Sequence, residues 1–403
     1  MLQNKVQSKV PELRFGEFRG EWKKKKLNEF ASKNTTKNIE DIVLPVLTNS
    51  AVRGVVIQGS FFNKDIANSE NTNGYYVVER DDFIYNPRIS NYAPVGPIKR
   101  NRMDTGLMSP LYTIFRFNSE CIDFMEEYFK SNHWFRYITK VSNIGARHDR
   151  MNITDADFFD LPLFIPLEDE QKKLADFLTS VDKKIELLQK KVELFKKYKK
   201  GMIHELLKQK KRFKLSNEKN YDAWKEKRIG EIFKQREERF QDNLELLSVT
   251  INSGIKRRTE IEGPDNSSRD KSNYKRVYRK DIVYNSMRMW QGASGVSPYD
   301  GVVSPAYTVL SSNSQNSSNF FGYYFKLPRI INLFERYSQG LTSDTWNLKY
   351  PQLSKIRLLV PELLEQQKIA DFLTAFDAFL ALKEQRLSAS KKFKKYLLQN
   401  MFV

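Results

Sequence analysis

IPLEDEQKKLADFLTSVD, residues 165–182, decides the fold because the chain contains this stretch twice; the second copy is VPELLEQQKIADFLTAFD at residues 360–377. Both copies keep a Glu-Gln pair that is followed by Ala-Asp-Phe-Leu-Thr. The copies lie 195 residues apart in a chain of 403 residues. Self-similarity at such a spacing is typical of a repeated structural unit, so the sequence predicts two similar units in tandem.

The repeat extends upstream of these two stretches. The matched pairs are Trp22 with Trp224, Asp82 with Asp281, Tyr85 with Tyr284, Asn86 with Asn285, Ser109-Pro110 with Ser304-Pro305, Tyr112-Thr113 with Tyr307-Thr308, Gly145 with Gly340, Asp149 with Asp344 and Asn152 with Asn347. The spacing falls from 199 residues at Asn86 to 195 residues at Ser109, so the first copy carries four extra residues between these positions. We expect the extra residues in a surface loop, where insertions are tolerated best.

Each copy of the repeated stretch begins a pattern that predicts a long helix, the first over about 168–208. Apolar residues recur there at alternating spacings of four and three, which is the seam of a coiled coil. The first seam is Leu174, Leu178, Val181, Ile185, Leu188, Val192 and Phe195, and the second is Ile369, Leu373, Phe376, Leu380 and Leu387, interrupted at Lys383 and Ser390. We expect the two helices to pair with each other. The alternative is two separate amphipathic helices, and the seam alone does not exclude parallel pairing.

The segments before the helices mix strand-like and helical patterns. Residues 43–49, 75–86, 244–250 and 274–285 are rich in apolar, aromatic and β-branched residues and predict strands. Short helices are expected near 120–130 and 327–337. The fold class is therefore α+β: two tandem mixed α/β domains, each followed by a long helix, with the helices paired as an antiparallel coiled coil about a pseudo-twofold axis. The expected domains are 1–165, 166–212 (central helix), 213–360 and 361–403 (C-terminal helix).

The charge of the chain favours a polyanion as partner. Lys and Arg number 68 against 49 Asp and Glu, a formal net charge of +19. Lys and Arg bound to phosphates release condensed counterions, so DNA binding explains this excess, and the alternative is a basic surface that serves only solubility. The single cysteine, Cys121, excludes an internal disulfide, and without an export signal or a membrane-spanning apolar run we expect a cytoplasmic protein and no membrane contact.

The motifs of common enzyme classes are missing from the sequence. No G-x-G stands where a dinucleotide or S-adenosylmethionine loop would need it, and no Gly-Lys of a phosphate loop occurs. The histidines His133, His148 and His204 are far apart, and one cysteine cannot form a Cys-rich zinc site. These observations predict that the chain has no catalytic residue and no metal site of its own.

Residues of base-reading type stand beside the matched framework and differ between the two copies. Arg and Lys pair with guanine in the major groove, where each bidentate pair contributes about 1–3 kcal/mol of discrimination. The candidate DNA-binding residues are Asn86, Arg88, Lys99, Arg100, Arg102, Arg147, His148 and Arg150 in the first copy, and Lys256, Arg257, Arg258, Arg269, Lys271, Asn285, Arg288, Trp290, Thr342 and Ser343 in the second. For each of them the alternative is a phosphate contact or a plain surface charge, and for Asn86 a structural role.

The sequence resembles the specificity subunits of type I restriction–modification enzymes. The resemblance rests on the duplicated P-x3-E-Q-x-K-[LI]-A-D-F-L element, on the long helix after it, and on Leu13-Arg14-Phe15 with Trp22, weakly echoed by Phe213 and Trp224. It implies two target-recognition domains, each reading one half of a bipartite DNA site, and an antiparallel pair of helices that sets the gap between the halves. It also implies a non-catalytic subunit that recruits two adenine-N6 methyltransferase subunits and two translocase/endonuclease subunits. S-adenosylmethionine, ATP and Mg would then belong to these partners.

The duplicated helix starts are candidates for partner binding. Two identical partners docking on the two copies would require the same residues twice, namely Glu170, Gln171 and Phe177 with Glu365, Gln366 and Phe372. Packing within the chain at the start of each helix is an equal alternative. For the whole chain two further hypotheses stay open, a self-sufficient nuclease or methyltransferase and a coiled-coil adaptor whose basic surface binds no specific DNA.

Overall fold

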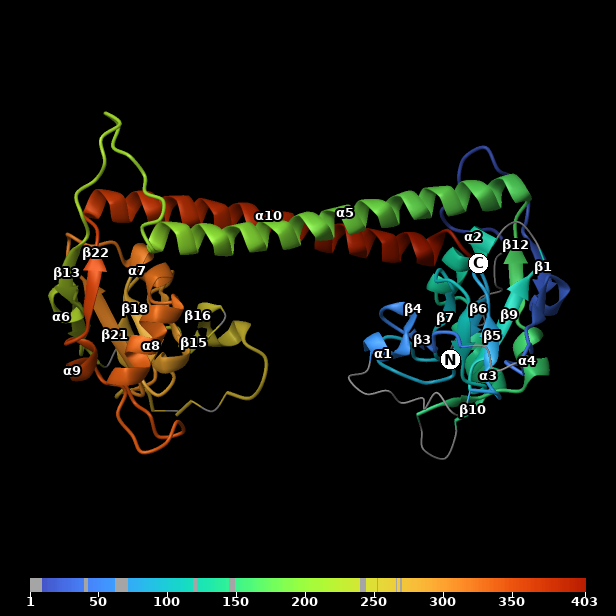
Figure 1. The fold of residues 1–403 in the computed structure, drawn as a ribbon, viewed down its shortest axis with the longest axis horizontal. Helices are drawn as coiled ribbons and strands as arrows, with labels where there is room; N and C mark the ends of the chain where they lie inside the picture. The colour runs from blue at the N-terminus through green and yellow to red at the C-terminus, as the bar shows by residue number, and fades with distance from the viewer. Residues whose placement is uncertain are drawn as a thin grey trace. The chain divides into compact units, whose positions relative to one another are not determined.

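The structure of the protein is a computed structural model that describes residues 9–39, 43–61, 72–118, 122–144, 149–239, 244–251, 253–265, 267–268 and 270–403. The chain divides into two compact units (Figure 1). Unit 1 contains residues 1–190 and 385–403, and unit 2 contains residues 191–384. Each unit therefore includes a part of both long helices. The four consecutive domains expected from the sequence stay a prediction.

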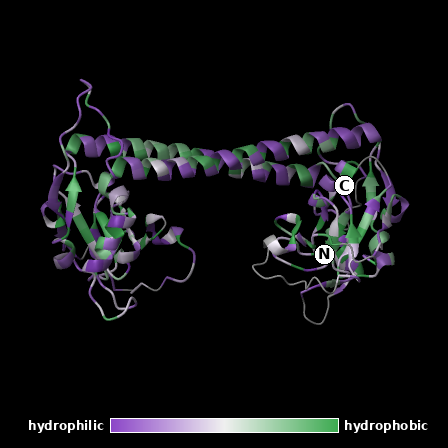
Figure 2. Cartoon of the chain, in the orientation of Figure 1, coloured by the Kyte–Doolittle hydropathy of each residue, from purple (hydrophilic) through white to green (hydrophobic). Residues whose placement is uncertain are grey.

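The two long helices are α5 (Glu168–Leu207) and α10 (Leu363–Asn400). Helix α5 begins with three acidic residues, Glu168, Asp169 and Glu170, which stabilise the positive end of the helix dipole. The sequence predicted this helix over 168–208, and that prediction is confirmed. Figure 2 shows hydrophobic and hydrophilic residues alternating along both helices, as expected for a helix with one packed side.

The contacts inside unit 2 show that α5 and α10 run antiparallel. Lys196 pairs with Glu384 at 2.6 Å, and one turn further along α5, Lys199 pairs with Asp377, which lies nearer the start of α10. Between them the ring of Phe195 packs edge-on against Phe379, with centroids 4.9 Å apart. Inside unit 1, the first part of α5 meets the last part of α10. The expected antiparallel pairing is confirmed, and the separate-helix and parallel alternatives are wrong.

Unit 1 is built around a four-stranded antiparallel sheet with the strand order β2-β9-β6-β7. Three two-stranded antiparallel pairs, β1-β12, β3-β4 and β5-β8, surround it, together with the short pair β10-β11. The strands are β1 (Lys23–Lys26), β2 (Ala31–Lys33), β3 (Leu47–Ser50), β4 (Gly54–Ile57), β5 (Tyr76–Val78), β6 (Phe83–Tyr85), β7 (Ile98–Arg100), β8 (Gly106–Met108), β9 (Thr113–Phe117), β10 (Asn143–Ile144), β11 (Met151–Asn152) and β12 (Pro162–Ile165). The helices are η1 (Leu27–Glu29), α1 (Gln58–Phe61), α2 (Ile122–Lys130), α3 (Phe135–Val141) and α4 (Asp155–Phe159).

Unit 2 repeats this plan. Its four-stranded sheet has the order β14-β21-β18-β19, and its two-stranded pairs are β13-β22, β15-β16 and β17-β20. The strands are β13 (Lys225–Arg228), β14 (Phe233–Arg236), β15 (Leu247–Thr250), β16 (Gly254–Arg257), β17 (Lys275–Val277), β18 (Ile282–Asn285), β19 (Ser294–Val296), β20 (Gly301–Val303), β21 (Tyr307–Ser312) and β22 (Arg357–Val360). The helices are α6 (Ile229–Ile232), η3 (Arg258–Glu260), η4 (Met289–Gln291), α7 (Ser318–Tyr324), α8 (Pro328–Tyr337) and α9 (Tyr350–Leu353). The predicted mixed α/β tandem is thus confirmed.

Each unit has a core in which aromatic residues of the sheet pack against the long helices. In unit 1, Phe83 and Phe115 are fully buried, and Leu178 of α5 and Phe402 at the end of the chain join the same core. In unit 2 the last turn of α5 contributes to the core, where Leu206 and Leu207 pack together with Phe233. The α5 residues thus belong to two different cores. In the described part of the chain, the helices include none with the length and apolar character needed to cross a membrane.

A buried carboxylate fastens each central sheet. Asp82 accepts two hydrogen bonds from the guanidinium of Arg116 on β9, at 2.7 and 3.1 Å. The matched Asp281 accepts two from Arg236 on β14, at 2.8 and 3.2 Å. The carboxylate is kept in both units, while its arginine comes from β9 in unit 1 and from β14 in unit 2. This supports the reading of Asp82 and Asp281 as framework residues.

The extra residues of the first copy lie in a loop, as expected. Between β6 and β7 the chain turns through Asn91 and Tyr92, both exposed, with 80% of Tyr92 accessible to solvent. Gly96 then takes a left-handed conformation with φ of +83°, and Gly292 does so in unit 2 with φ of +80°.

Candidate nucleic-acid interface

In unit 1, the turn that follows β6 brings two of the predicted arginines together. The side-chain oxygen Oδ1 of Asn86 accepts a hydrogen bond from the backbone N–H of Arg88 at 3.0 Å, and its Nδ2 donates to the backbone oxygen of Asn49 at 2.9 Å. Asn86 therefore shapes the turn, which is the structural role considered from the sequence. Arg88 forms an isolated antiparallel bridge with Arg150, and the Arg88 side chain is exposed.

Unit 2 has the same turn with different side chains. Asn285 Oδ1 accepts from the backbone N–H of Met287 at 3.0 Å, and Arg288 next to it is exposed. Trp290 packs edge-on against Trp346, with ring centroids 5.1 Å apart and planes at 79°. The backbone N–H of Leu348 also donates to Ser286 at 2.8 Å, so the chain around 346–348 lies against the turn.

A second loop, which leads to the segment that lies against the Arg288 turn, carries the predicted Thr342 and Ser343. Its two ends are joined by an antiparallel bridge between Gln339 and Asn347. Thr345 Oγ1 donates to the backbone oxygen of Thr342 at 3.0 Å, which closes the turn. Both predicted residues are exposed. In unit 1 the matched residues include Arg147 and His148, which lie outside the described residues, as does Arg269 of unit 2.

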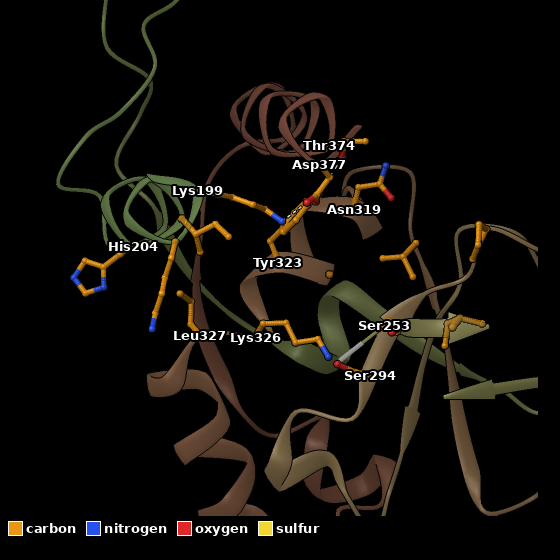
Figure 3. Close-up of a pocket in the computed structure, with 18 of the residues that line it drawn as sticks. Lys199, His204, Ser253, Ser294, Asn319, Tyr323, Lys326, Leu327, Thr374 and Asp377 are labelled. Atoms are coloured by element: carbon orange, nitrogen blue, oxygen red, sulfur yellow. Dashed lines mark hydrogen bonds and ion pairs between the residues drawn. The ribbon is translucent and has the colours of Figure 1, made fainter. Parts of the chain in front are cut away.

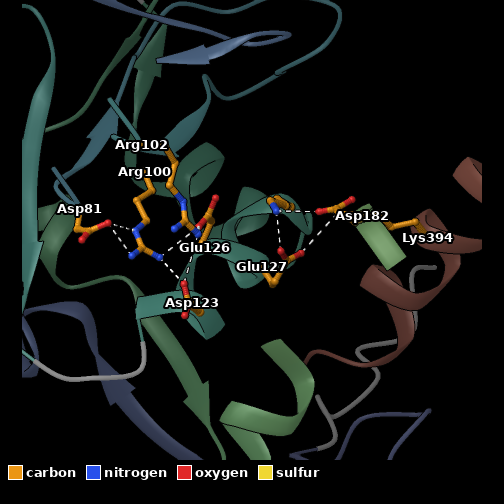
Figure 4. Close-up of polar contacts among 9 residues, drawn as sticks. Asp81, Arg100, Arg102, Asp123, Glu126, Glu127, Asp182 and Lys394 are labelled. Atoms are coloured by element: carbon orange, nitrogen blue, oxygen red, sulfur yellow. Dashed lines mark hydrogen bonds and ion pairs between the residues drawn. The ribbon is translucent and has the colours of Figure 1, made fainter. Parts of the chain in front are cut away.

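Two predicted residues of unit 1, Arg100 and Arg102, form ion pairs with carboxylates of their own unit (Figure 4). The side chain of Arg100 is only 5% exposed and forms ion pairs with Asp81 at 2.6 Å and with Asp123 at 2.5 Å. Its donors are therefore used inside the unit, and contact of Arg100 with DNA stays a prediction that would require these ion pairs to break.

The two neighbours of Arg100 are also engaged. Arg102 is half exposed but pairs with Glu126 and with Asp123. Burial lowers the pKa of Lys99, and the positive charge of Lys130 lowers it further. Lys99 is half buried, and its contact with DNA stays a prediction. For Arg102, DNA contact stays a prediction that would require the side chain to leave its carboxylates.

The basic residues near β16 support their own loops. Arg257 pairs with Glu245 at 3.0 Å and lies 4.5 Å from the ring centre of Tyr299. Arg258 donates to the backbone oxygens of three residues, Ile261, Gly263 and Pro264, and thus holds the loop after η3. Lys256 pairs with Glu260 at 3.6 Å. Lys271 donates to the backbone oxygen of Ser268 at 2.8 Å. Arg257 is exposed, whereas Lys256, Arg258 and Lys271 are half buried.

Three of the predicted partner-binding residues are buried within their own unit. Glu365 is fully buried and accepts hydrogen bonds from Arg212 and from Trp224 Nε1. Glu170 is 1% exposed and is bound by Arg14 at 2.7 Å. Gln366 is fully buried and donates to the backbone oxygen of Pro361 at 2.9 Å. These contacts support packing within the chain, and contact of the three residues with a partner stays a prediction that would require them to become exposed.

The remaining three partner candidates are half buried. Gln171 donates to the backbone oxygen of Pro166 at 3.0 Å. Phe177 packs edge-on against Phe15, and Phe372 packs against Phe213 in the same way, with ring centroids 5.6 and 5.7 Å apart. Their contact with a partner stays a prediction.

Trp346 is the interface residue that the sequence reasoning missed. Its ring supports Trp290 and thereby the turn that carries Arg288. The signal that could have found it is the position one residue before the matched Asn347, in a stretch where the two copies differ. No group of three or more His, Cys, Asp or Glu residues that could hold a metal ion occurs in the described ranges.

Comparison with known proteins agrees with this geometry. Residues 221–390 match the family model described as the type I restriction modification DNA specificity domain. A curated protein from Methanocaldococcus jannaschii, described as the MjaX type I restriction enzyme specificity subunit, is 24% identical over 300 residues. This match spans 68% of the present chain and 65% of the relative, slightly less than two thirds of its length.

The solved structures that resemble the chain have the same fold at low sequence identity. The type I restriction-modification S subunit from M. genitalium has a TM-score of 0.56 at 15% identity and covers 98% of this chain and 99% of its own. The HsdS subunit from Thermoanaerobacter tengcongensis has a TM-score of 0.50 at 14% identity, with 94% and 96% covered. The tandem fold and the matched domain confirm the resemblance of this chain to the specificity subunits of type I restriction–modification enzymes, with residues 221–390 similar to their DNA specificity domain.

Proposed function

We propose that the chain is the sequence-specific DNA-binding subunit of a type I restriction–modification complex, and that it reads a bipartite, asymmetric site with one unit for each half. One observation carries this proposal. The two units share the turn built by Asn86 or Asn285, but the side chains on that turn differ, with exposed Arg88 in one unit and exposed Arg288 beside the half-buried Trp290 in the other. A protein that reads two different half-sites requires two units with the same backbone turn and different exposed side chains on it.

The exposed arginines on the two turns are suited to binding DNA. Arg88 and Arg288 are exposed, and a guanidinium can form two parallel hydrogen bonds to guanine O6 and N7 in the major groove. The net charge of +19 supplies the attraction to phosphates that does not depend on sequence. The carboxylates that neutralise Arg100 lie elsewhere in unit 1, so they do not cancel the charge of Arg88.

The proposal includes the role of the chain in a complex. The chain would be non-catalytic and cytoplasmic, and it would recruit two adenine-N6 methyltransferase subunits and two translocase/endonuclease subunits, which bring S-adenosylmethionine, ATP and Mg. The paired helices α5 and α10 would fix the gap between the half-sites about a pseudo-twofold axis. A relative described as part of the assembly of a type I R-M system supports this role; it has a TM-score of 0.53 at 13% identity.

The alternative function is a coiled-coil adaptor with a non-specific basic surface. The observation that favours it is the number of predicted DNA-binding residues that are engaged in ion pairs, such as Arg100 and Arg257. Under this alternative, binding to all DNA sequences would weaken equally as salt rises. Competition between a target duplex and a scrambled duplex at one fixed salt concentration separates the two functions.

The direct test substitutes one arginine in each unit. Arg88→Ala and Arg288→Ala are each expressed with the methyltransferase subunits, and methylated adenines are mapped across the genome. The matched controls are Arg80→Ala and Arg279→Ala, which occupy equivalent turns after β5 and β17 and are exposed. We expect Arg88→Ala and Arg288→Ala each to relax the sequence requirement in one half of the site and to leave the other half unchanged. The loss of discrimination at the affected base should be about 1–3 kcal/mol.

Two outcomes would contradict the proposal. If both halves of the site weaken equally in the Arg88 variant, that residue contacts only phosphate. If the purified chain transfers methyl groups to DNA with S-adenosylmethionine and without partners, the non-catalytic role is wrong. The controls should leave the methylated sequence unchanged.

A further inference from the structure

Unit 2 contains a cavity of about 770 Å³ between the last part of α5 and the strands β16 and β19 (Figure 3). Helix α7 and the first part of α10 complete its walls. This volume lies within the range of about 300–1,000 Å³ that is typical of small-molecule sites. The cavity lies apart from the predicted DNA-reading residues, none of which lines it.

The same place in unit 1 is largely filled by side chains. The cavity there measures about 190 Å³, and it is lined by Lys99, Arg100 and Glu126. Lys99 and Arg100 pair across the sheet with Ile84 and Phe83, as Gly295 and Val296 pair with Val283 and Ile282, so Gly295 and Val296 take the places of Lys99 and Arg100 in unit 2. The shared fold thus creates a space in both units, and the small residues of unit 2 leave it open.

Four lysines line this cavity, Lys196, Lys199, Lys200 and Lys326, and Lys326 lacks the carboxylates that its counterpart in unit 1 has. Phe124 packs on Trp22 as Phe320 packs on Trp224, and six residues further along stand Lys130 in unit 1 and Lys326 in unit 2. Lys130 pairs with Glu127 at 2.6 Å and with Asp182 at 3.0 Å. The Nζ of Lys326 donates only to two backbone oxygens within the described residues, Gly292 at 2.5 Å and Ile251 at 3.2 Å. An ammonium has three donors, so one N–H of Lys326 is left for a ligand.

Ser294 places a second donor at the same point. Its hydroxyl is fully buried and has no hydrogen-bond partner among the described residues, although buried hydroxyls are nearly always paired. The backbone N–H of Ser294 donates to the same Gly292 oxygen as Lys326, at 2.8 Å, so the two residues meet at one acceptor. An unpaired hydroxyl beside an ammonium without a carboxylate is suited to an oxyanion.

The rest of the wall is suited to an apolar body. Ile203, Ile255 and Leu327 line the cavity together with the ring of Tyr323. The Tyr323 hydroxyl donates to Asp377 at 2.6 Å, and Lys199 also pairs with Asp377. That carboxylate is thereby neutralised and does not repel an anion at Lys326.

We propose that this cavity binds a small organic anion, with one carboxylate or phosphate group on Lys326 and Ser294 and an apolar body against the wall formed by Tyr323 and Ile255. The site is separate from DNA reading and does not depend on it. Burial lowers the pKa of Lys326 to about 8. A bound anion would raise this pKa, because it stabilises the ammonium.

The test uses three probes that share one aromatic body. Binding of 1-naphthoate, 1-naphthyl phosphate and the neutral 1-naphthamide to the full-length chain is measured by titration calorimetry. We expect one or both anions to bind more tightly than the amide, and the stronger of the two identifies the preferred head group. In Lys326→Met the anion affinity should fall about tenfold to a hundredfold, the effect of a charge-assisted hydrogen bond.

Ser294→Ala and Lys355→Met complete the test. Ser294→Ala removes only the unpaired hydroxyl and should weaken anion binding with no loss of thermal stability, so it remains informative if Lys326→Met folds poorly. Lys355 is exposed and does not line the cavity, so Lys355→Met should bind like the original chain. The proposal is overturned if no probe binds, if the amide binds as tightly as the anions, or if neither cavity variant changes the affinity.

Discussion

Arg212 donates two hydrogen bonds to the carboxylate of Glu365, from Nε at 3.0 Å and from Nη2 at 2.7 Å. Trp224 Nε1 adds a third at 3.0 Å. Arg14 and Trp22 form the same arrangement around Glu170 in unit 1. Each unit thus fastens the segment before its first strand to the start of a long helix, and it uses the duplicated glutamate to do so.

Removing the arginine of this arrangement should destabilise unit 2 strongly. In Arg212→Ala, Glu365 stays fully buried without its ion-pair partner, and such a change costs on the order of 3 kcal/mol. The matched control is Arg357→Ala, because Arg357 pairs with Glu226 at 2.7 Å on the surface, where an ion pair contributes about 0–1 kcal/mol. Urea unfolding followed by hydrogen exchange of unit 2 peptides measures both. Equal losses in the two variants would show that the buried pair has no special role.

The repeated Glu-Gln element shows what the sequence could and could not predict. Its duplication correctly predicted two units and two paired helices, because apolar spacing and self-similarity are local properties of the chain. It could not predict that Glu170 and Glu365 are buried within their own units, because the residues that bind them there, Arg14 and Arg212, stand more than 150 positions away in the sequence. Residues kept in both copies were needed for the fold of each copy.

The seam of α10 should be far more sensitive than its exposed side. Leu373 is fully buried in the core of unit 2, and Leu373→Ala should cost about 2–5 kcal/mol of unfolding free energy through the cavity it leaves. Leu382 on the same helix is 61% exposed, so Leu382→Ala should change the stability by about 0.5 kcal/mol or less. Chemical denaturation of both variants is the measurement. A large loss in Leu382→Ala would mean that α10 packs on a different side.

The substitution Gly201→Ala should stabilise the folded protein. It lies inside α5, it is exposed, and a Cβ added there meets no atom within 4 Å. Gly costs roughly 0.5–1 kcal/mol relative to Ala in a helix, so Gly201→Ala should raise the free energy of unfolding by that amount. Gly96→Ala is the opposite case, because its φ is +83° and the added Cβ would collide with the backbone oxygen of Asn86. We expect Gly96→Ala to destabilise unit 1, and thermal unfolding of the two variants should move in opposite directions.

The surface charges were the part of the site that the sequence predicted least well. Arg88 and Arg288 are exposed as expected, since they follow a turn that the matched asparagines mark. Arg100 has the same residue type but is enclosed by Asp81 and Asp123, which only the fold brings to it. Charge and composition cannot distinguish a guanidinium that meets solvent from one that meets a carboxylate, because that depends on contacts between distant segments.

The buried Lys326 should make the stability of unit 2 depend on pH above neutrality. Its pKa is about 8 in the folded chain, below the ordinary lysine value of 10.5, because burial disfavours the ammonium. Between these two values the unfolded chain binds more protons than the folded chain, so the free energy of unfolding should rise with pH from about 8 to about 10.5. Below about pH 8 the ammonium is charged in both states, so the full cost of burying it is present and stability no longer changes with pH through this group.

Lys326→Met isolates this effect from the other titrating groups. The nearby Lys199, Tyr323 and Asp377 are present in both proteins, so their contributions largely cancel in the difference between them. The original chain should gain stability relative to Lys326→Met as pH rises from 7 to 10, whereas the surface variant Lys355→Met should follow the original chain throughout. Urea unfolding at pH 7, 8, 9 and 10 gives the difference directly. A difference that stays constant over this range would mean that the Lys326 ammonium is as well solvated in the cavity as it is in the unfolded chain.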